Sequence, residues 1–111
     1  MKIKHLIAKL INCKIEEKLF SDEKFMEKVC DEIVEKLKMK ILNKIYHKFN
    51  PYGLSMIYLI AESHVAIHTW PEYKFIDLEI VTCKEDSKVF EGLEVAVKYF
   101  KPEKVESNYW E

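Results

Sequence analysis

Short runs in which apolar and polar residues alternate are the feature that most constrains the fold of this chain. The clearest run is Phe75–Cys83, where every second residue is aliphatic or threonine. A period of two predicts a strand with one buried face. Similar runs rich in Ile, Leu and Val predict further strands over Lys2–Asn12, Ile41–Phe49, Leu54–Ala61, His64–Trp70 and Val105–Trp110.

Two other segments have a helical period. From Ser21 to Leu37 apolar residues recur at steps of three and four, with Ser21 as a candidate N-cap and acidic residues in the first turn. Ser87–Phe100 has the same period and is ended by Pro102. The order β-α-β-β-β-β-α-β predicts the α+β class. We expect a two-layer α/β sandwich, a mainly antiparallel sheet with both helices on one face.

The 111 residues have the length of one domain, so residues 1–111 are expected to fold as a single unit. Three widely spaced cysteines (Cys13, Cys30 and Cys83) are typical of a reducing compartment. Lysines interrupt the N-terminal apolar run that a signal peptide would need. The longest uncharged stretch, Phe49–Ala61, is too short to span a bilayer. We expect a cytoplasmic protein.

The charge balance argues against several classes of partner. Eighteen basic and nineteen acidic residues give a net charge of -1, which leaves no positive excess for nucleic acid or an anionic membrane. All the basic residues are lysine, so the bidentate contacts of arginine are missing. With only two glycines, a glycine-rich phosphate loop is also missing. We therefore expect no nucleic-acid partner and no membrane partner.

The segment Ala61–Tyr73 concentrates the chemically versatile residues. His64 and His68 have the spacing of helical metal ligands, but the residues between them favour a strand and no third ligand is near, so no metal is expected. Ser63 and His68 could form a hydrolase pair, yet no Gly-x-Ser-x-Gly elbow surrounds the serine. A solvated strand with incidental histidines fits the spacing as well.

About forty residues around this segment resemble S-adenosylmethionine decarboxylase of the short prokaryotic type. The resemblance implies a pyruvoyl-dependent enzyme that decarboxylates S-adenosylmethionine and so supplies the aminopropyl donor for spermidine synthesis. It rests on the motifs Tyr46–Phe49, Pro51–Ser55, Glu62–His64, Ile67–Tyr73 and Thr82–Cys83.

The resemblance also implies that the enzyme makes its own cofactor. The Ser63 hydroxyl would attack the Glu62–Ser63 peptide bond, and β-elimination of the resulting ester would cut the chain. The products would be a β chain, Met1–Glu62, and an α chain from residue 63 to Glu111 that begins with a pyruvoyl group. The pyruvoyl ketone would form a Schiff base with the substrate amine and serve as the electron sink for decarboxylation.

Roles follow from the resemblance for five further residues. Ser55 would donate to the oxyanion, His68 would remove the serine α-proton, and Cys83 would return a proton to the product carbon. Phe49 would stack on adenine and Glu72 would hold the ribose hydroxyls. On pattern alone, Cys83 and Phe49 fit core positions and Glu72 fits a solvated turn. Cys13 and Cys30 are interpreted as structural.

A dimer would resolve a conflict between these roles. On a straight strand Ser63 and His68 point to opposite faces. By resemblance the protein is a homodimer in which Ser63 and Cys83 of one protomer meet His68 and the other site residues of the second. Packing two sheets face to face would give an αββα sandwich and would cover a sheet face that otherwise needs a partner.

Several positions depart from the usual pattern of this family, among them Ile3, which stands where Gly-x-His would have its glycine before His5. Lys9 stands where an acidic residue is typical, Met56 replaces a small residue, Lys84 replaces a glycine, and Phe90 stands near the usual tryptophan. Two alternatives therefore stay open beside S-adenosylmethionine decarboxylase. One is a pyruvoyl-dependent arginine or ornithine decarboxylase on the same scaffold, and the other is a non-catalytic dimeric paralogue.

Overall fold

The computed structural model describes all 111 residues, and its strands and helices follow the predicted order. Two short 3-10 helices, Glu17–Ser21 and Pro71–Tyr73, were not predicted. The final strand begins at Pro102, earlier than predicted. The bounds are β1 Lys4–Cys13, α1 Glu23–Leu37, β2 Lys40–Lys48, β3 Leu54–Ala61, β4 Ser63–Trp70, β5 Phe75–Thr82, α2 Val89–Phe100 and β6 Pro102–Trp110.

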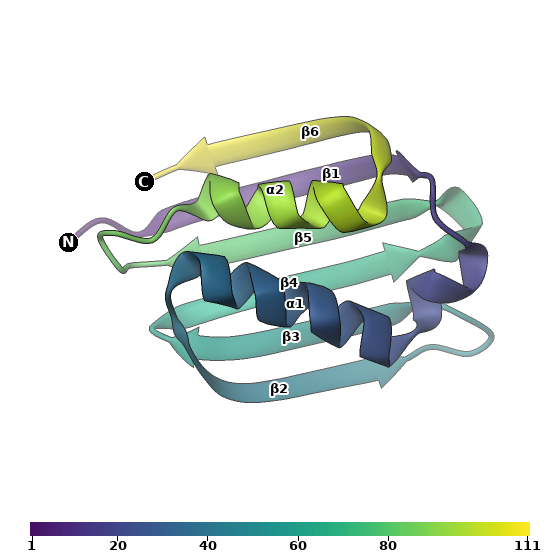
Figure 1. Ribbon diagram of the computed structural model, residues 1–111, viewed down its shortest axis with the longest axis horizontal. Helices are drawn as coiled ribbons and strands as arrows, with labels where there is room; N and C mark the ends of the chain where they lie inside the picture. The colour runs from purple at the N-terminus through teal and green to yellow at the C-terminus, as the bar shows by residue number, and fades with distance from the viewer.

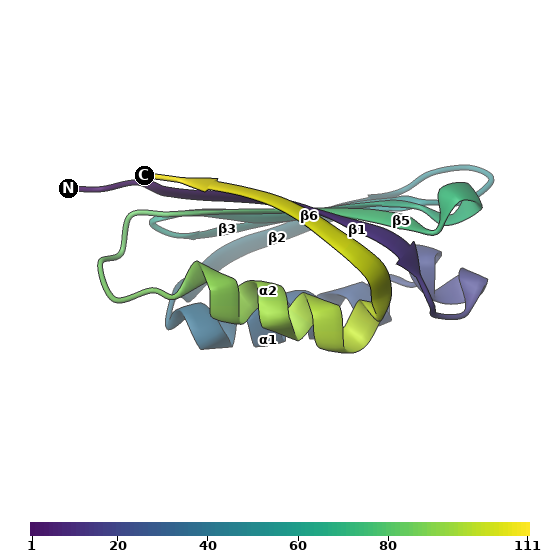
Figure 2. The ribbon, with the colours of Figure 1, turned by 90° about the horizontal axis from the view of Figure 1, so that it is seen from above.

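The six strands form one sheet in the order β2-β3-β4-β5-β1-β6, and all neighbouring strands are antiparallel. α1 and α2 lie across the same face of this sheet (Figure 1). In Figure 2, which shows the sheet edge-on, both helices lie on one side of the sheet and no part of the chain covers the other side. These features confirm the predicted α+β two-layer sandwich. No helix combines the length and apolar character that crossing a bilayer requires.

The N-terminus of α1 differs from the prediction, because Ser21 is not its cap. The cap is Asp22, whose carboxylate accepts hydrogen bonds from the N–H groups of Lys24 and Phe25 at 3.0 and 3.1 Å. Ser21 ends the preceding 3-10 helix, and its Oγ accepts a hydrogen bond from the Gly53 N–H at 2.8 Å. Both residue types cap helices well, so local preference did not distinguish them.

The second helix also begins later than predicted, at Val89 rather than Ser87. Ser87 is buried, and its Oγ donates to the Lys84 carbonyl at 2.8 Å. This side-chain bond closes a turn between β5 and α2, a use of serine that competes with helix formation.

The core fills the layer between the helices and the sheet. In β5, Ile76, Leu78 and Ile80 are fully buried on the helix side, as the alternation predicted. Gly92 of α2 lies directly against side chains of β5 and α1. A Cβ there would lie 2.9 Å from Ile80 Cδ1 and 3.2 Å from Ile33 Cγ2, so a larger residue would force these side chains to move.

The other side of the sheet, here called the open face, is covered by no part of the chain (Figure 2). It carries Ile57, Leu59 and Trp70, which are between 40% and 52% exposed, and such a surface normally packs against a partner. All four histidines lie on it. Strand alternation and register assign to it His5, Ile7, Lys9, Ile11, Asn43, Ile45, His47, Ser55, Ile57, Leu59, His64, Ala66, His68, Trp70, Phe75, Asp77, Glu79, Val81, Lys104, Glu106, Asn108 and Trp110.

Candidate active site

The predicted cleavage site lies in the tight turn between β3 and β4. Glu62 is the only residue between the two strands, and Ser63 begins β4. Ser63 has a φ of +143°, a backbone conformation that residues other than glycine rarely adopt. Its Cα pairs with that of Thr82 in β5. The Glu62–Ser63 bond, the predicted cleavage point, is therefore held in a strained turn beside the end of β5.

Cys83 follows the last residue of β5, and its thiol reaches this turn. Its Sγ lies 3.7 Å from the carbonyl oxygen and 3.5 Å from Oε2 of Glu62. The loop after Cys83 is fastened by Lys4, whose Nζ donates to the carbonyls of Glu85 and Ser87, both at 2.7 Å. The structure thus brings Glu62, Ser63 and Cys83 together at one end of the sheet.

The other two cysteines have different surroundings. Cys13 and Cys30 are completely buried in the core, and all three thiols are free. Burial raises the pKa of Cys13 to about 12, and it raises the pKa of Cys30 as well. Both thiols stay protonated at physiological pH, which makes them poor nucleophiles. Cys83 is only partly buried, so it is the accessible thiol of the chain.

Ser55 and His68 meet on the open face, on the adjacent strands β3 and β4. Ser55 Oγ and His68 Nδ1 are 2.7 Å apart, so they form a hydrogen bond. When Nδ1–H donates to Ser55, Nε2 keeps its lone pair and the Ser55 hydroxyl hydrogen remains free to donate elsewhere. In this tautomer one pair supplies both a base and an oxyanion donor. These are the two roles predicted for it.

Phe49 and Glu72 lie in turns at the same end of the sheet as this pair. The half-exposed Phe49 ring contacts the His47 ring edge-on, with 4.7 Å between centroids. The turn is closed by a hydrogen bond from Phe49 N–H to the Gly53 carbonyl at 2.9 Å. Gly53 has a φ of +101°, which its residue type permits. Glu72 is exposed, in the 3-10 helix that follows β4.

Thr69 holds the chain around this turn and was given no role by the sequence analysis. Its Oγ1 donates to the Phe20 carbonyl at 2.7 Å and accepts from the Leu54 N–H at 2.9 Å. Thr69, Phe20 and Leu54 are all buried. The sequence could have indicated this role, because Thr69 falls on the core side of a predicted strand and a buried hydroxyl needs a hydrogen-bond partner.

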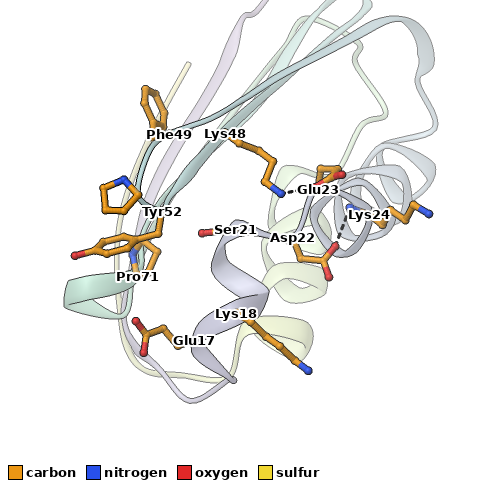
Figure 3. A pocket seen from close by; sticks show the side chains of 11 residues that line it. Glu17, Lys18, Ser21, Asp22, Glu23, Lys24, Lys48, Phe49, Tyr52 and Pro71 are labelled. Atoms are coloured by element: carbon orange, nitrogen blue, oxygen red, sulfur yellow. Dashed lines mark hydrogen bonds and ion pairs between the residues drawn. The ribbon is translucent and has the colours of Figure 1, made fainter.

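An open pocket of about 780 Å³ surrounds the turn (Figure 3). Phe49 and Tyr52 point away from the helices, whereas Lys48 and Glu23 face one another in an ion pair of 3.1 Å. Phe49 is the only predicted site residue in its lining. The lining consists of Glu17, Lys18, Ser21, Asp22, Glu23, Lys24, Lys48, Phe49, Pro51, Tyr52 and Pro71.

Within one chain the predicted residues form two separate groups, here called half-sites. One consists of Glu62, Ser63 and Cys83, and the other of Ser55, His68, Phe49 and Glu72 at the opposite end of the sheet. Ser63 and His68 are five residues apart on β4, or about 16 Å at 3.3 Å per residue. They do not form a hydrolase pair within one chain. His64 and His68 are about 13 Å apart by the same measure, too far to bind one metal ion. The two half-sites of one chain therefore do not meet.

The open face also holds charged neighbours that the sequence analysis did not single out. His64 Nε2 lies 2.7 Å from Glu79 Oε1. Asp77 lies opposite His68 on one side and opposite Lys9 on the other. The alternation of β5, which put Asp77 and Glu79 on one face, was the signal that could have found them.

Residues 4–111 match the family described as S-adenosylmethionine decarboxylase. The chain belongs to this family. A protein of Archaeoglobus fulgidus named S-adenosylmethionine decarboxylase proenzyme is 42% identical over 100 residues, covering 90% of this chain and 88% of its own. A protein of the same name from Thermodesulfovibrio yellowstonii is 37% identical over 95 residues, covering 86% of this chain and 66% of its own.

A solved structure shares the fold. The crystal structure of the adenosylmethionine decarboxylase from Aquifex aeolicus superposes with a TM-score of 0.88, covering 98% of this chain and 88% of that one. The two sequences are 22% identical, so this likeness bears on the fold alone. Together with the family match, it identifies the two-layer sandwich as the family's architecture.

Proposed function

We propose that the chain is the proenzyme of a pyruvoyl-dependent S-adenosylmethionine decarboxylase, which cleaves itself between Glu62 and Ser63. The observation that carries the proposal is the strained Glu62–Ser63 turn with the Cys83 thiol 3.7 Å from the Glu62 carbonyl oxygen. Membership of the S-adenosylmethionine decarboxylase family supports it, as do relatives named proenzymes.

Cleavage would use only groups of the protein and water. Ser63 Oγ attacks the Glu62 carbonyl carbon and the C–N bond breaks, so the amide becomes an ester and the Ser63 amine is freed. A base then removes the Ser63 α-proton while the Cβ–Oγ bond breaks, and Glu62 leaves as the carboxylate that ends chain 1–62. The dehydroalanine at residue 63 takes up water and releases ammonia, which leaves a pyruvoyl group on chain 63–111.

Each step needs a partner that the two half-sites contain. The Ser55 hydroxyl can donate to the oxyanion formed by the attack, and the free Nε2 of His68 can accept the α-proton. The S–H of Cys83 is already within reach of the carbonyl that is attacked. Positive φ at Ser63 adds strain that cutting the chain would release.

The same residues would serve the decarboxylation. The pyruvoyl ketone supplies an electrophile for the substrate amine and an electron sink as carbon dioxide leaves. Cys83, next to residue 63, can return a proton to the product carbon. The exposed Phe49 ring offers a flat apolar surface for adenine, and the Glu72 carboxylate can accept hydrogen bonds from ribose hydroxyls.

A dimer with shared sites is part of the proposal. The separation of about 16 Å between Ser63 and His68 supports it, because a single chain cannot bring them together. The uncovered apolar residues of the open face support it as well. Packing two open faces together would complete both sites and give an αββα sandwich.

Mixing inactive subunits tests the shared sites. Cys83→Ala and His68→Ala chains, refolded together, should regain activity, since each mixed dimer then has one intact site. Cys83→Ala mixed with Ser63→Ala is the matched control and should stay inactive, because both changes fall in the same half-site. A fully active monomer at micromolar concentration would refute the dimer.

The substrate is tested by carbon dioxide release from carboxyl-labelled compounds. The relatives' names favour S-adenosylmethionine, the substrate of an enzyme that supplies the aminopropyl donor for spermidine. Release from S-adenosylmethionine but not from arginine or ornithine is expected. Release from an amino acid alone would assign the chain to the alternative decarboxylases. The three free thiols suit the reducing cytoplasm, where we place the enzyme.

A further inference from the structure

One line of polar side chains crosses the open face from edge to edge and includes His68, the predicted base. The register aligns one residue of each strand, and we call this line the polar row. Its neighbours on either side are largely apolar or aromatic, such as Ile45, Ile57, Ala66 and Ile7 in the next line. The polar row consists of His47, Ser55, His68, Asp77, Lys9 and Glu106, in the order of the strands.

Asp77 is the carboxylate of this row that stands beside His68. Cross-strand neighbours have Cβ atoms about 5 Å apart, and Asp77 has His68 as its neighbour on β4 and Lys9 as its neighbour on β1. Burial raises the pKa of Asp77, and Glu79 on the same strand raises it further, while the charges of His68 and Lys9 lower it. The only other open-face carboxylate of β5, Glu79, is already paired with His64 at 2.7 Å.

We propose that Asp77 is a positioning residue that stabilises the charged form of His68, with Lys9 as the charged neighbour on its other side. This inference rests on the proposed function, in which His68 removes the Ser63 α-proton. Taking up that proton turns the imidazole into a cation on a face that dimerisation would shield from water. A carboxylate one strand away lowers the energy of this cation, and the attraction between the two charges is mutual.

Lys9 lies on the other side of Asp77 from His68. A lysine facing a positively charged substrate would oppose binding, and Lys9 stands where the family typically has an acid. Lys9 is aligned with Asp77 on one side and with Glu106 on the other, so acids flank its charge. Position 9 is separated from His68 by Asp77, which is the acid next to His68.

The test measures the rate of chain cleavage by intact mass, between about pH 6 and about pH 8.5, where histidine chemistry changes. Asp77→Asn should cleave on the order of 10-fold more slowly than the unaltered chain, and Asp77→Glu should recover most of the rate.

Two controls separate this role from a structural one. Asp86→Asn makes the same chemical change in an exposed loop and should leave the rate unchanged. Because the pKa of Asp77 is raised by folding, its ionised form opposes folding above that pKa. Asp77→Asn should therefore be at least as thermally stable as the unaltered chain at neutral pH.

The outcomes are distinct. Slow cleavage by a stable Asp77→Asn, with recovery in Asp77→Glu, supports the inference. A rate and pH profile equal to those of the unaltered chain would overturn it and leave the proposed function intact. Equal losses in Asp77→Asn and Asp77→Glu with lowered stability would overturn it as well, as evidence of a packing role. An unaltered chain that never cleaves would refute the proposed function and this inference with it.

Discussion

Replacing Thr69 by valine should lower the free energy of unfolding more than the similar size of the two side chains suggests. Valine has nearly the same shape as threonine but no hydroxyl, so the Phe20 carbonyl and the Leu54 N–H would both lose their partner. All three residues are buried, so water cannot easily replace these bonds. Each unsatisfied buried group costs about 1–3 kcal/mol. We expect a loss of about 3 kcal/mol in the free energy of unfolding.

Thr69→Ser is the matched comparison. It keeps the hydroxyl and removes one methyl group, which should cost about 1 kcal/mol. Valine should therefore be worse than serine, although hydrophobicity alone would predict the reverse order.

Urea unfolding at equal protein concentration, followed by tryptophan fluorescence, measures both changes. The substitutions should be made in Ser63→Ala chains, so that cleavage does not complicate the transition. Equal stabilities for the valine variant and its parent, or a serine variant weaker than the valine one, would refute the reasoning. In the cleavable chain, Thr69→Val should also raise KM, because the turn carrying Phe49 loses its anchor.

Two further predictions concern the cysteines. Cys83→Ala should still cleave, but more slowly. The cleaved enzyme should then turn over about 10²–10⁴-fold more slowly and inactivate progressively, because no group is positioned to return a proton to the product carbon. Turnover equal to that of the unaltered enzyme would make Cys83 an ordinary packing residue. A thiol reagent at about pH 8 should modify Cys83 alone in the native protein and all three cysteines after unfolding. Rapid native labelling of Cys13, whose pKa burial raises to about 12, would contradict its place in the core.

The order of elements could be predicted because each segment carries its own period. The alternation of Phe75–Cys83 and the helical steps from Phe25 to Leu37 depend on burial of one face, and both were confirmed. The errors lie where a polar side chain had more than one use. Ser21 bonds to the distant Gly53 rather than capping α1, and Ser87 closes a turn. Such choices depend on tertiary contacts that no local window contains.

The candidate site was predictable to a smaller degree. The motif supplied Ser63 and His68 as candidates, and the predicted strand already separated them. The contact of His68 with Ser55 and that of Cys83 with Glu62 emerged only from the fold. The pairing of Asp77 with both His68 and Lys9 depends on sheet order, because β1 joins β5 across most of the sequence. The alternation of residues predicts which face of the sheet each side chain lies on, but it does not predict which strands are adjacent.

Intact mass spectrometry of the purified chain tests the central claim, that this protein makes its own pyruvoyl group. The unaltered chain should separate without added protease into residues 1–62 and a fragment beginning at residue 63 with a blocked N-terminus. The Ser63→Ala chain, which lacks the attacking hydroxyl, should remain a single species of 13.3 kDa apart from the lost oxygen. An unaltered chain that stays whole after prolonged warm incubation would contradict the account.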